Sequence, residues 1–591
     1  MQPERWAGWR VPAAAFALFV WNAYICLRLF SAEFNQHMDS VEGLFIGLTR
    51  FTMRNWGDLT WLPLWFMGMP FHHVYPPGIP VTAAGLATVM HWSPAHAWHF
   101  LLAFLYSLGP ALLFWSAWTL SGRFGAALSA GILWTVLSPS CLLVPAIWHD
   151  TGEIISNRRL HNIVAWGEGA NAVMLGVAML AIALLHLALT RGRPIHYLGA
   201  VLACAAVPLC SWPAAMALVM AVACYMLSRE PGEWKRTIPR LLLIGAFAYA
   251  LAAGWIPPST IIATWARTQV MMAPSPPGPA RPLAALGLLL LLAALWMVFR
   301  RFRLPFWFRF SVFYLAVTGW ICLLASWGGP QLLTQSKRFQ LAMETGFILT
   351  LVFGVGLLIE GRRRTQYVAA ALLLLFAIPQ TIVARRHARD DLAPIGIQST
   401  LEFQTARWFQ QNMHGARVFA TGSTSFWMNA FTDTPQLIGC CDQANTSSMN
   451  DVASYTIESA DQPGDRDVEV RTAWMKAFGV QAIALGGPAT RDAYKVINRP
   501  ESLIAALPVA RRDGDDYILT VPARSPPWPT SCAVPTCRRA SPKTASTSPP
   551  CASMSMPSRT PPTPLSRIAG PTTTPPASTR FLPPARSSAS R

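Results

Sequence analysis

Long apolar runs constrain this chain more than any other feature of its sequence. Eleven runs close to the length that crosses about 30 Å of hydrocarbon can be placed, with an error of one or two. They lie at residues 11–31, 97–118, 124–148, 170–190, 195–211, 213–228, 240–256, 283–300, 309–327, 341–360 and 366–384. Only 13% of the residues are charged, whereas soluble chains average about 25%. The sequence therefore predicts a mainly α, polytopic bundle of transmembrane helices.

Basic residues predict the orientation of this bundle. Sixteen Lys and Arg residues fall in six short segments that alternate with the apolar runs, as expected of cytoplasmic loops. The N-terminus is therefore expected inside, and the chain from about residue 385 onward is expected outside. The formal net charge is +19. Because the basic residues sit between apolar runs, nucleic acid is not an expected partner.

The predicted organisation has three parts. Residues 1–384 form the bundle, with a first external loop at 32–96, and residues 385–523 form a small external α/β domain. Within that domain, the pattern indicates helices at 398–414 and 468–478, strands at 417–420, 480–485 and 518–521, and turns at 421–425 and 511–516. No glycine pattern of a phosphate loop is present, which favours a helper, lid or binding role for this domain.

The third part is the tail at 524–591, rich in Pro, Ser, Thr, Ala and Arg. Without an apolar period it cannot bury a core, so a disordered extension is one interpretation. Out-of-frame translation of GC-rich DNA is the other. The abrupt change after the strand-like 517–521 favours the second interpretation, and no function is drawn from the tail.

Two carboxylates in the first external loop are the leading candidates for chemistry. Asp39 and Glu42 lie three residues apart in HMDSVEG and share a face if this segment is helical. They could act as base and partner, or share a divalent cation. The alternative is a solvated carboxylate near the start of a helix. Their position just after the first apolar run favours function.

Further ionisable residues gather on the predicted external side, where burial beside a membrane would be costly. The acidic candidates for lining a cavity are Asp150, Glu153, Glu168 and Glu344. Pairing with a neighbouring Arg is an equally good explanation of Glu168. Lys337 and Arg338 just precede an apolar run and suit a phosphate or pyrophosphate group. Snorkelling to lipid headgroups would satisfy the same two cations.

The first loop also carries W-x-P-x-W-F-x-G-x-P…Y-P-P, from Trp61 to Pro77. Together with the preceding Asp39 and Glu42, the many spans and an external α/β domain, this stretch resembles the GT-C superfamily of polytopic glycosyltransferases. More narrowly, the chain is similar to bacterial membrane proteins labelled 6-pyruvoyl-tetrahydropterin synthase-related, although no residue here indicates pterin chemistry. The resemblance covers roughly residues 10–520.

The resemblance implies a transferase of the bacterial inner membrane that moves a sugar from a polyprenyl-phosphate donor on the periplasmic side. Asp39 would be the base, Glu42 would orient or assist it, and Lys337 and Arg338 would hold the departing phosphate. Asp39 and Glu42 depart from the closely paired acidic motif of the best-defined members, which leaves metal use open. The alternative is a non-catalytic protein that binds or moves a lipid-linked glycan in envelope assembly.

Overall fold

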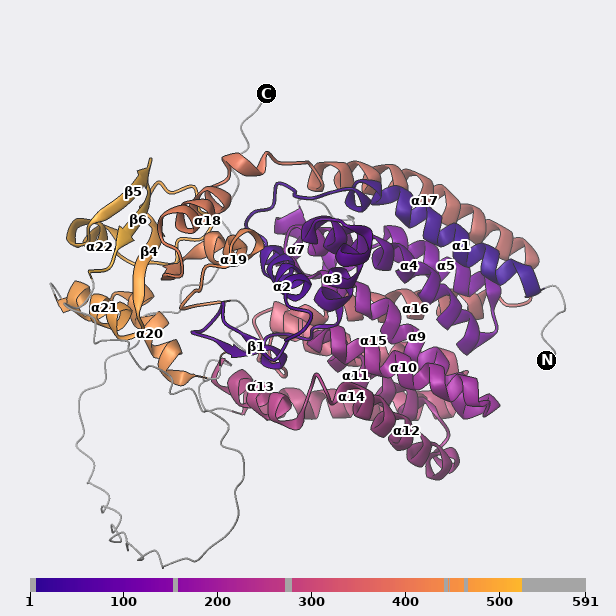
Figure 1. Ribbon diagram of the computed structural model, residues 1–591. Helices are drawn as coiled ribbons and strands as arrows, with labels where there is room; N and C mark the ends of the chain where they lie inside the picture. The colour runs from indigo at the N-terminus through magenta and orange to yellow at the C-terminus, as the bar shows by residue number, and fades with distance from the viewer. Residues whose placement is uncertain are drawn as a thin grey trace, which may run out of the picture. The chain divides into compact units, whose positions relative to one another are not determined.

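The computed structural model describes residues 7–151, 158–271, 279–439, 445, 447–461 and 466–522. Glu153 and the tail at 524–591 lie outside this part of the chain. The described chain is mainly helical (Figure 1), and six of its helical segments are long and apolar enough to cross a membrane. These are α4 (Pro94–Ser121), α9 (Gly169–Arg191), α14 (Ala280–Phe302), α15 (Phe306–Ser326), α16 (Gln340–Leu358) with the preceding η3 (Ser336–Phe339), and α17 (Arg363–Asp391).

Each of the eleven expected runs contains a helix, but eleven crossings remain a prediction. The other runs form α1 (Ala7–Ile25), α5 (Phe124–Val136), α10 (Pro194–Cys210), α11 (Trp212–Ser228) and α12 (Pro231–Ala252). The single run expected at 124–148 is wrong. It is divided into α5, α6 (Ser140–Leu143) and α7 (Pro145–Thr151), because Pro139 and Pro145 lack the amide N–H that a continuous helix requires.

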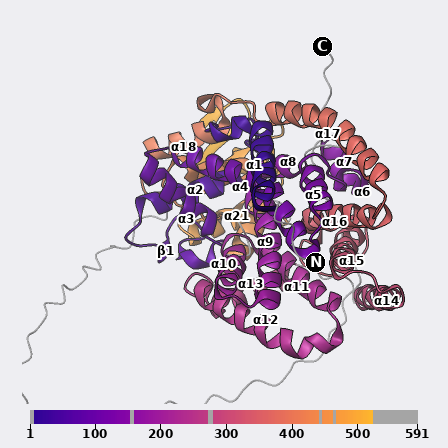
Figure 2. The same ribbon diagram turned by 90° about the vertical axis from the view of Figure 1, so that its right-hand side faces the viewer.

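Close helix packing builds the interior of the bundle. A Cβ added to Gly176 of α9 would lie 3.0 Å from the Cα atom of Gly109 of α4, so these two spans meet backbone to backbone. The outer helices differ, because α14 and α17 leave most of their apolar surface uncovered, as lipid-facing helices do. Figure 2 shows both at the periphery, with α9 inside. Trp21 of α1 donates to the Thr381 hydroxyl of α17 at 3.2 Å.

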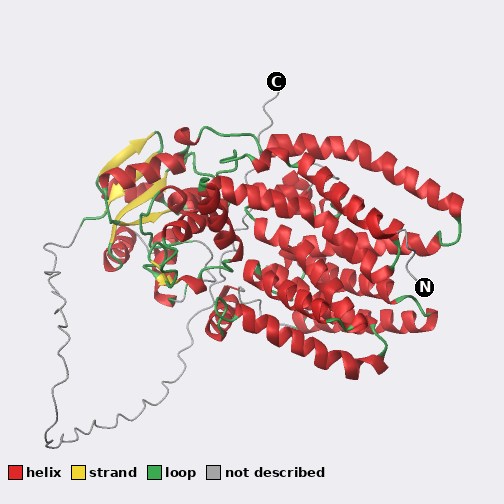
Figure 3. Cartoon of the chain, turned by 45° about the vertical axis from the view of Figure 1, so that its right-hand side comes forward, coloured by secondary structure: helices red, strands yellow, loops and turns green. Residues whose placement is uncertain are grey.

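The α/β region, residues 397–522, has one four-stranded sheet in the order β3-β4-β6-β5. Strand β3 (Arg417–Ala420) is parallel to β4 (Val480–Gly486), and β6 (Asp516–Thr520) is antiparallel to both β4 and β5 (Val509–Asp513). Its helices are η4 (Ile397–Ser399), α18 (Leu401–Asn412), α19 (Gly422–Phe431), α20 (Ser448–Ser459), α21 (Arg466–Ala477) and α22 (Pro500–Ala506). Figure 3 shows this sheet gathered at one end of the helical bundle.

The three expected strands are present, but the turn expected at 421–425 is wrong, since α19 begins at Gly422. The turn expected at 511–516 is also wrong in extent, because it contains the ends of β5 and β6. The alternation of buried and exposed side chains that marks a strand is weak in β5, whose residues are exposed or half-buried.

Helix α2 (Glu42–Arg54) joins the bundle to the α/β region, because α19 packs directly on it. A Cβ at Gly43 would lie 2.5 Å from the Trp427 ring, and one at Gly47 would lie 3.0 Å from the Asn429 backbone. Two glycines four residues apart therefore allow the close approach. The remaining connecting elements are η1 (Leu27–Phe30), β1 (Trp61–Leu62), β2 (Met69–Pro70), η2 (Phe71–His73), α3 (Gly78–Met90), α8 (Arg158–Val164) and α13 (Pro258–Met271).

Candidate functional site

Asp39 is an exposed residue on a segment that is otherwise held in place. Four residues near it between η1 and α2 are buried, namely Asn35, His37, Met38 and Ser40, and so is Glu42 at the start of α2. The Gln36 amide donates to the Ala393 carbonyl at 3.1 Å, which ties the segment to the chain beyond α17. No hydrogen bond or ion pair from a residue that the structure describes reaches the Asp39 carboxylate. The Asp39 carboxylate is thus exposed on a segment whose backbone is tethered.

Glu42 has the opposite environment and is only 1% exposed. Its Oε1 atom accepts from Trp98 Nε1 at 3.0 Å and lies 3.0 Å from His99 Nε2. Its Oε2 atom accepts from Asn35 Nδ2 at 3.2 Å. Glu42 therefore anchors the start of α2 to α4, and its contacts fit a structural carboxylate.

The sequence left open that Asp39 and Glu42 share a divalent cation, but the contacts of Glu42 do not fit such a site. Both Glu42 oxygens face nitrogen groups of the protein, whereas a divalent cation requires free oxygen lone pairs. Within the described ranges, no group of three or more His, Cys, Asp or Glu residues is arranged to hold a metal ion. We therefore derive no chemistry through a metal at this site.

Tyr494 of the α/β region reaches the Asp39 segment. Its hydroxyl donates to the Asp39 backbone carbonyl at 2.7 Å, and its ring lies edge-on to Phe426 with centroids 5.7 Å apart. Burial raises the pKa of Tyr494 to about 12, and the negative charges of Asp39 and Asp492 add to this effect. The hydroxyl consequently remains a donor near neutral pH.

The two predicted phosphate-binding cations differ in how they are held. Arg338 Nη2 forms an ion pair with Glu168 Oε1 at 2.8 Å, whereas the Lys337 side chain is exposed. Glu168 follows Gly167, where an added Cβ would lie 2.6 Å from the Glu42 amide nitrogen. These contacts bring the segment of Lys337 and Arg338 to the same end of the bundle as the Asp39 segment.

Asp150, a candidate from the sequence, belongs to a chain of alternating acidic and basic side chains that sequence reasoning did not connect. It pairs with Arg158, accepts from Trp166 Nε1 at 3.0 Å, and lies 3.6 Å from His161 Nε2. His161 Nδ1 lies 3.1 Å from Asp391 Oδ2, whose Oδ1 atom lies 3.7 Å from His37 Nε2. This His37–Asp150 chain joins the Asp39 segment to α7, α8 and α17. The available signals were that His37 stands two residues from Asp39 and that Asp150 and His161 share the polar stretch 148–162.

Two groups of this chain have altered pKa values. Burial alone would lower the pKa of His161, but hydrogen bonds and charges from Asp150 and Asp391 raise it to about 9. Burial would raise the pKa of Asp150, but His161 and Arg158 lower it to about 2. Near neutral pH both groups are therefore charged and attract each other.

Glu344, expected to line a cavity, is 0% exposed inside the bundle. Its Oε2 atom lies 2.7 Å from Arg159 Nη1, and its Oε1 atom accepts from the Ser140 hydroxyl and amide. The Arg159 guanidinium lies 4.7 Å from the centre of the Trp134 ring. Both groups of the Glu344–Arg159 ion pair therefore have partners, and their contacts join α16 to α5, α6 and α8.

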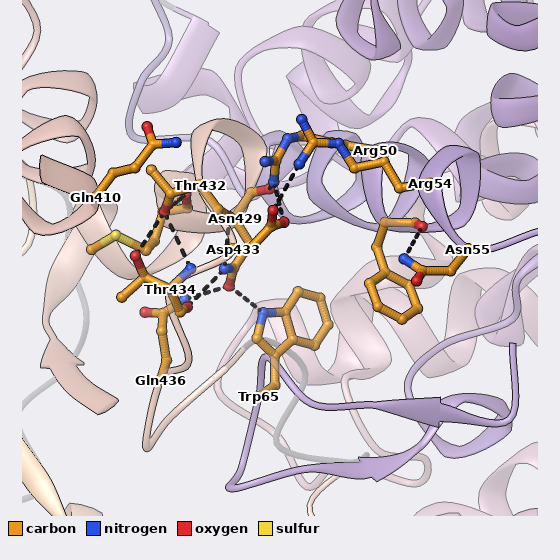
Figure 4. Close-up of polar contacts among 12 residues, drawn as sticks. Arg50, Arg54, Asn55, Trp65, Gln410, Asn429, Thr432, Asp433, Thr434 and Gln436 are labelled. Atoms are coloured by element: carbon orange, nitrogen blue, oxygen red, sulfur yellow. Dashed lines mark hydrogen bonds and ion pairs between the residues drawn. The ribbon is translucent and has the colours of Figure 1, made fainter. Parts of the chain in front are cut away.

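Polar contacts at the junction of α2 with the α/β region form a second interface (Figure 4). Arg50 and Arg54 lie 2.8 and 2.7 Å from the two oxygens of Asp433. Asn429 Oδ1 accepts from Trp65 Nε1 at 2.9 Å and from Gln436 Nε2 at 2.8 Å. The first loop is therefore bonded to α19 and to the segment that follows it.

No protein-family model matches the chain, and no curated protein matches it in sequence. Solved structures do match. An oligosaccharyltransferase of Archaeoglobus fulgidus has a TM-score of 0.50 at 11% identity, covering 82% of this chain and 70% of its own. The chain therefore resembles this oligosaccharyltransferase in fold, and at 11% identity the likeness extends to the fold alone.

Two further matches have lower scores. ArnT of Cupriavidus metallidurans bound to undecaprenyl phosphate has a TM-score of 0.46 at 13% identity, over 87% of this chain and 98% of its own. The mycobacterial arabinofuranosyltransferase AftD has a TM-score of 0.46 at 14% identity, over 87% of this chain and 41% of its own. Nothing in these comparisons supports the similarity to proteins labelled 6-pyruvoyl-tetrahydropterin synthase-related.

Proposed function

We propose that the protein is a membrane glycosyltransferase that moves a sugar from a polyprenyl-phosphate donor to an acceptor hydroxyl. The observation that carries the proposal is the exposed Asp39 carboxylate on a partly buried and tethered segment. The GT-C-like fold supports it at the level of architecture alone. We place the site on the periplasmic face of a bacterial inner membrane, with the α/β region outside.

In this proposal Asp39 is the general base. Its carboxylate takes the proton of the acceptor hydroxyl as the acceptor oxygen attacks the anomeric carbon of the donor sugar. The bond from that carbon to the phosphate oxygen breaks, and the polyprenyl phosphate leaves with the bonding electrons. Lys337 stabilises the charge that grows on the leaving phosphate. Arg338 contributes beside it, oriented by Glu168, while Glu42 holds the start of α2.

A non-catalytic protein that binds or moves a lipid-linked glycan is the second candidate function. The exposed cation Lys337 would serve lipid-phosphate binding equally well without any reaction. The two candidates differ in what they require of Asp39, because only a transferase needs a base there.

The comparison of Asp39→Asn with Asp58→Asn tests the proposal. Both residues are exposed carboxylates of the first loop, and Asp58 lies outside the proposed site. The purified chain in lipid nanodiscs is incubated with a panel of undecaprenyl-phosphate sugars together with glycan acceptors that carry free hydroxyls, and released undecaprenyl phosphate is measured by mass spectrometry. We expect release by the unaltered chain and by Asp58→Asn, and release at least about 100-fold slower with Asp39→Asn.

Binding of undecaprenyl phosphate is measured in parallel. Asp39→Asn should bind it normally, whereas Lys337→Ala should bind it more weakly. Equal release by both Asp variants would remove Asp39 as the base. Binding without release by the unaltered chain would favour the non-catalytic alternative.

A further inference from the structure

We propose that the α/β region supplies a positioning residue, Tyr494, which fixes the backbone of Asp39. This inference rests on the proposed function of Asp39. It makes the α/β region part of the reaction site, so that the region does more than cover the bundle.

The contact itself joins two residues 455 positions apart in the chain. The Tyr494 hydroxyl donates to the Asp39 carbonyl at 2.7 Å, and this carbonyl belongs to the peptide that leads to Ser40. On the other side, the Asn35 segment is already tied to residues beyond α17. Tyr494 therefore fixes the carboxyl side of Asp39, and the bundle fixes the amino side.

The loop that carries Tyr494 is itself held rigidly. Asp492 Oδ1 accepts from the Ser423 amide at 3.0 Å, the Ser423 hydroxyl at 3.1 Å and the Tyr494 amide at 2.9 Å. The Asp492 carboxylate thus caps the N-terminus of α19, where the helix dipole favours a negative charge. Gly422 has a φ of +58°, and an added Cβ there would collide with this carboxylate.

Helix α19 also connects back to Asp39, through α2. Helix α19 packs on α2 through Gly43 and Gly47, and α2 begins three residues after Asp39. The ring of Phe426 on α19 also meets the ring of Tyr494. A closed path consequently runs from Asp39 through α2 and α19 to Asp492, and through Tyr494 back to Asp39.

This arrangement predicts a specific kinetic effect. The Tyr494 hydroxyl touches the backbone of Asp39, so its loss should misorient the base and leave donor binding unchanged. Small losses of orientation lower turnover without changing ground-state binding. If Tyr494 had only a structural role, loss of its hydroxyl would instead lower the amount of folded protein. The protein that still folded would keep nearly the same kcat and KM.

Tyr494→Phe tests the inference, because it removes the hydroxyl and keeps the ring against Phe426. Tyr455→Phe is the matched control, since the Tyr455 hydroxyl interacts with Asp461 inside the α/β region. With the undecaprenyl-phosphate sugar that the chain turns over, Tyr494→Phe should lower kcat about three- to tenfold at unchanged KM. The control should match the unaltered chain.

Asp492→Ala tests whether Asp492 acts through Tyr494. Its kcat should fall by a similar factor, and the double variant with Tyr494→Phe should be no slower than the slower single variant. Multiplying effects in the double variant would contradict the shared path. If Asp492→Ala fails to fold, the comparison of Tyr494→Phe with Tyr455→Phe decides alone.

A measurement without turnover completes the test. A nitroxide spin label on Asp39→Cys should become more mobile when Tyr494→Phe is added, and should not change when Tyr455→Phe is added. Unchanged label mobility overturns the inference. Full turnover by Asp39→Asn would instead overturn the proposed function, so the two failures are distinguishable.

Discussion

Asp39 and Glu344 are both carboxylates beside apolar helices, but the structure uses them in opposite ways. Glu344 is 0% exposed, and both of its oxygens are occupied by Arg159 and Ser140. Asp39 is exposed, and the surrounding contacts hold its backbone and leave its carboxylate to solvent. The comparison shows that a charged group buried within the bundle, such as Glu344, is paired. Where only the backbone is fixed, as at Asp39, the carboxylate stays exposed.

The largest effect that separates the two regions should come from the buried pair. Glu344→Ala leaves Arg159 uncompensated inside the bundle, which should cost about 3–5 kcal/mol of folding free energy. Thermal unfolding of the purified chain in detergent measures this loss. Glu360→Ala is the control, because Glu360 pairs with Arg123 at 2.6 Å but is 57% exposed. Its effect should stay below about 1 kcal/mol. Similar melting of both variants would refute the structural role of Glu344.

The His37–Asp150 chain is intermediate between buried Glu344 and exposed Asp39, because its groups are paired and can still titrate. The pKa of His161 is about 9 in the folded chain, above its ordinary value of 6.5. Its stabilising contribution should therefore be complete below pH 6.5 and be lost as the pH rises through about 9. The groups that face it are Asp150 and Asp391, with Arg158 and His37 next to them.

Melting temperatures recorded between about pH 6 and pH 10 check this dependence. His161→Gln should flatten the alkaline decline, whereas His149→Gln, an exposed histidine of α7, should leave it unchanged. Alkaline loss of stability that persists in His161→Gln would show that another group is responsible.

The sequence predicted the apolar helices and three strands, because these follow from local patterns. It could not show that Glu42 is an anchor, since its partners Trp98 and His99 lie on a distant helix. Nor could it place Tyr494 beside Asp39, because that contact depends on how α19 packs on α2. Long-range packing therefore decides which of two nearby carboxylates stays free, and local spacing cannot.

The junction at Asp433 should give the smallest effect and the finest test of the same distinction. The Arg50 side chain is 10% exposed and also donates to the Asn429 carbonyl at 3.3 Å, whereas the Arg54 side chain is 57% exposed. Arg50→Ala should therefore cost about 1–2 kcal/mol, because a partly buried charge-assisted bond is lost. Arg54→Ala should cost at most about 0.5 kcal/mol. Limited proteolysis of the α/β region, with thermal unfolding, measures both. Equal losses would mean that charge alone, independent of burial, holds α2 to α19.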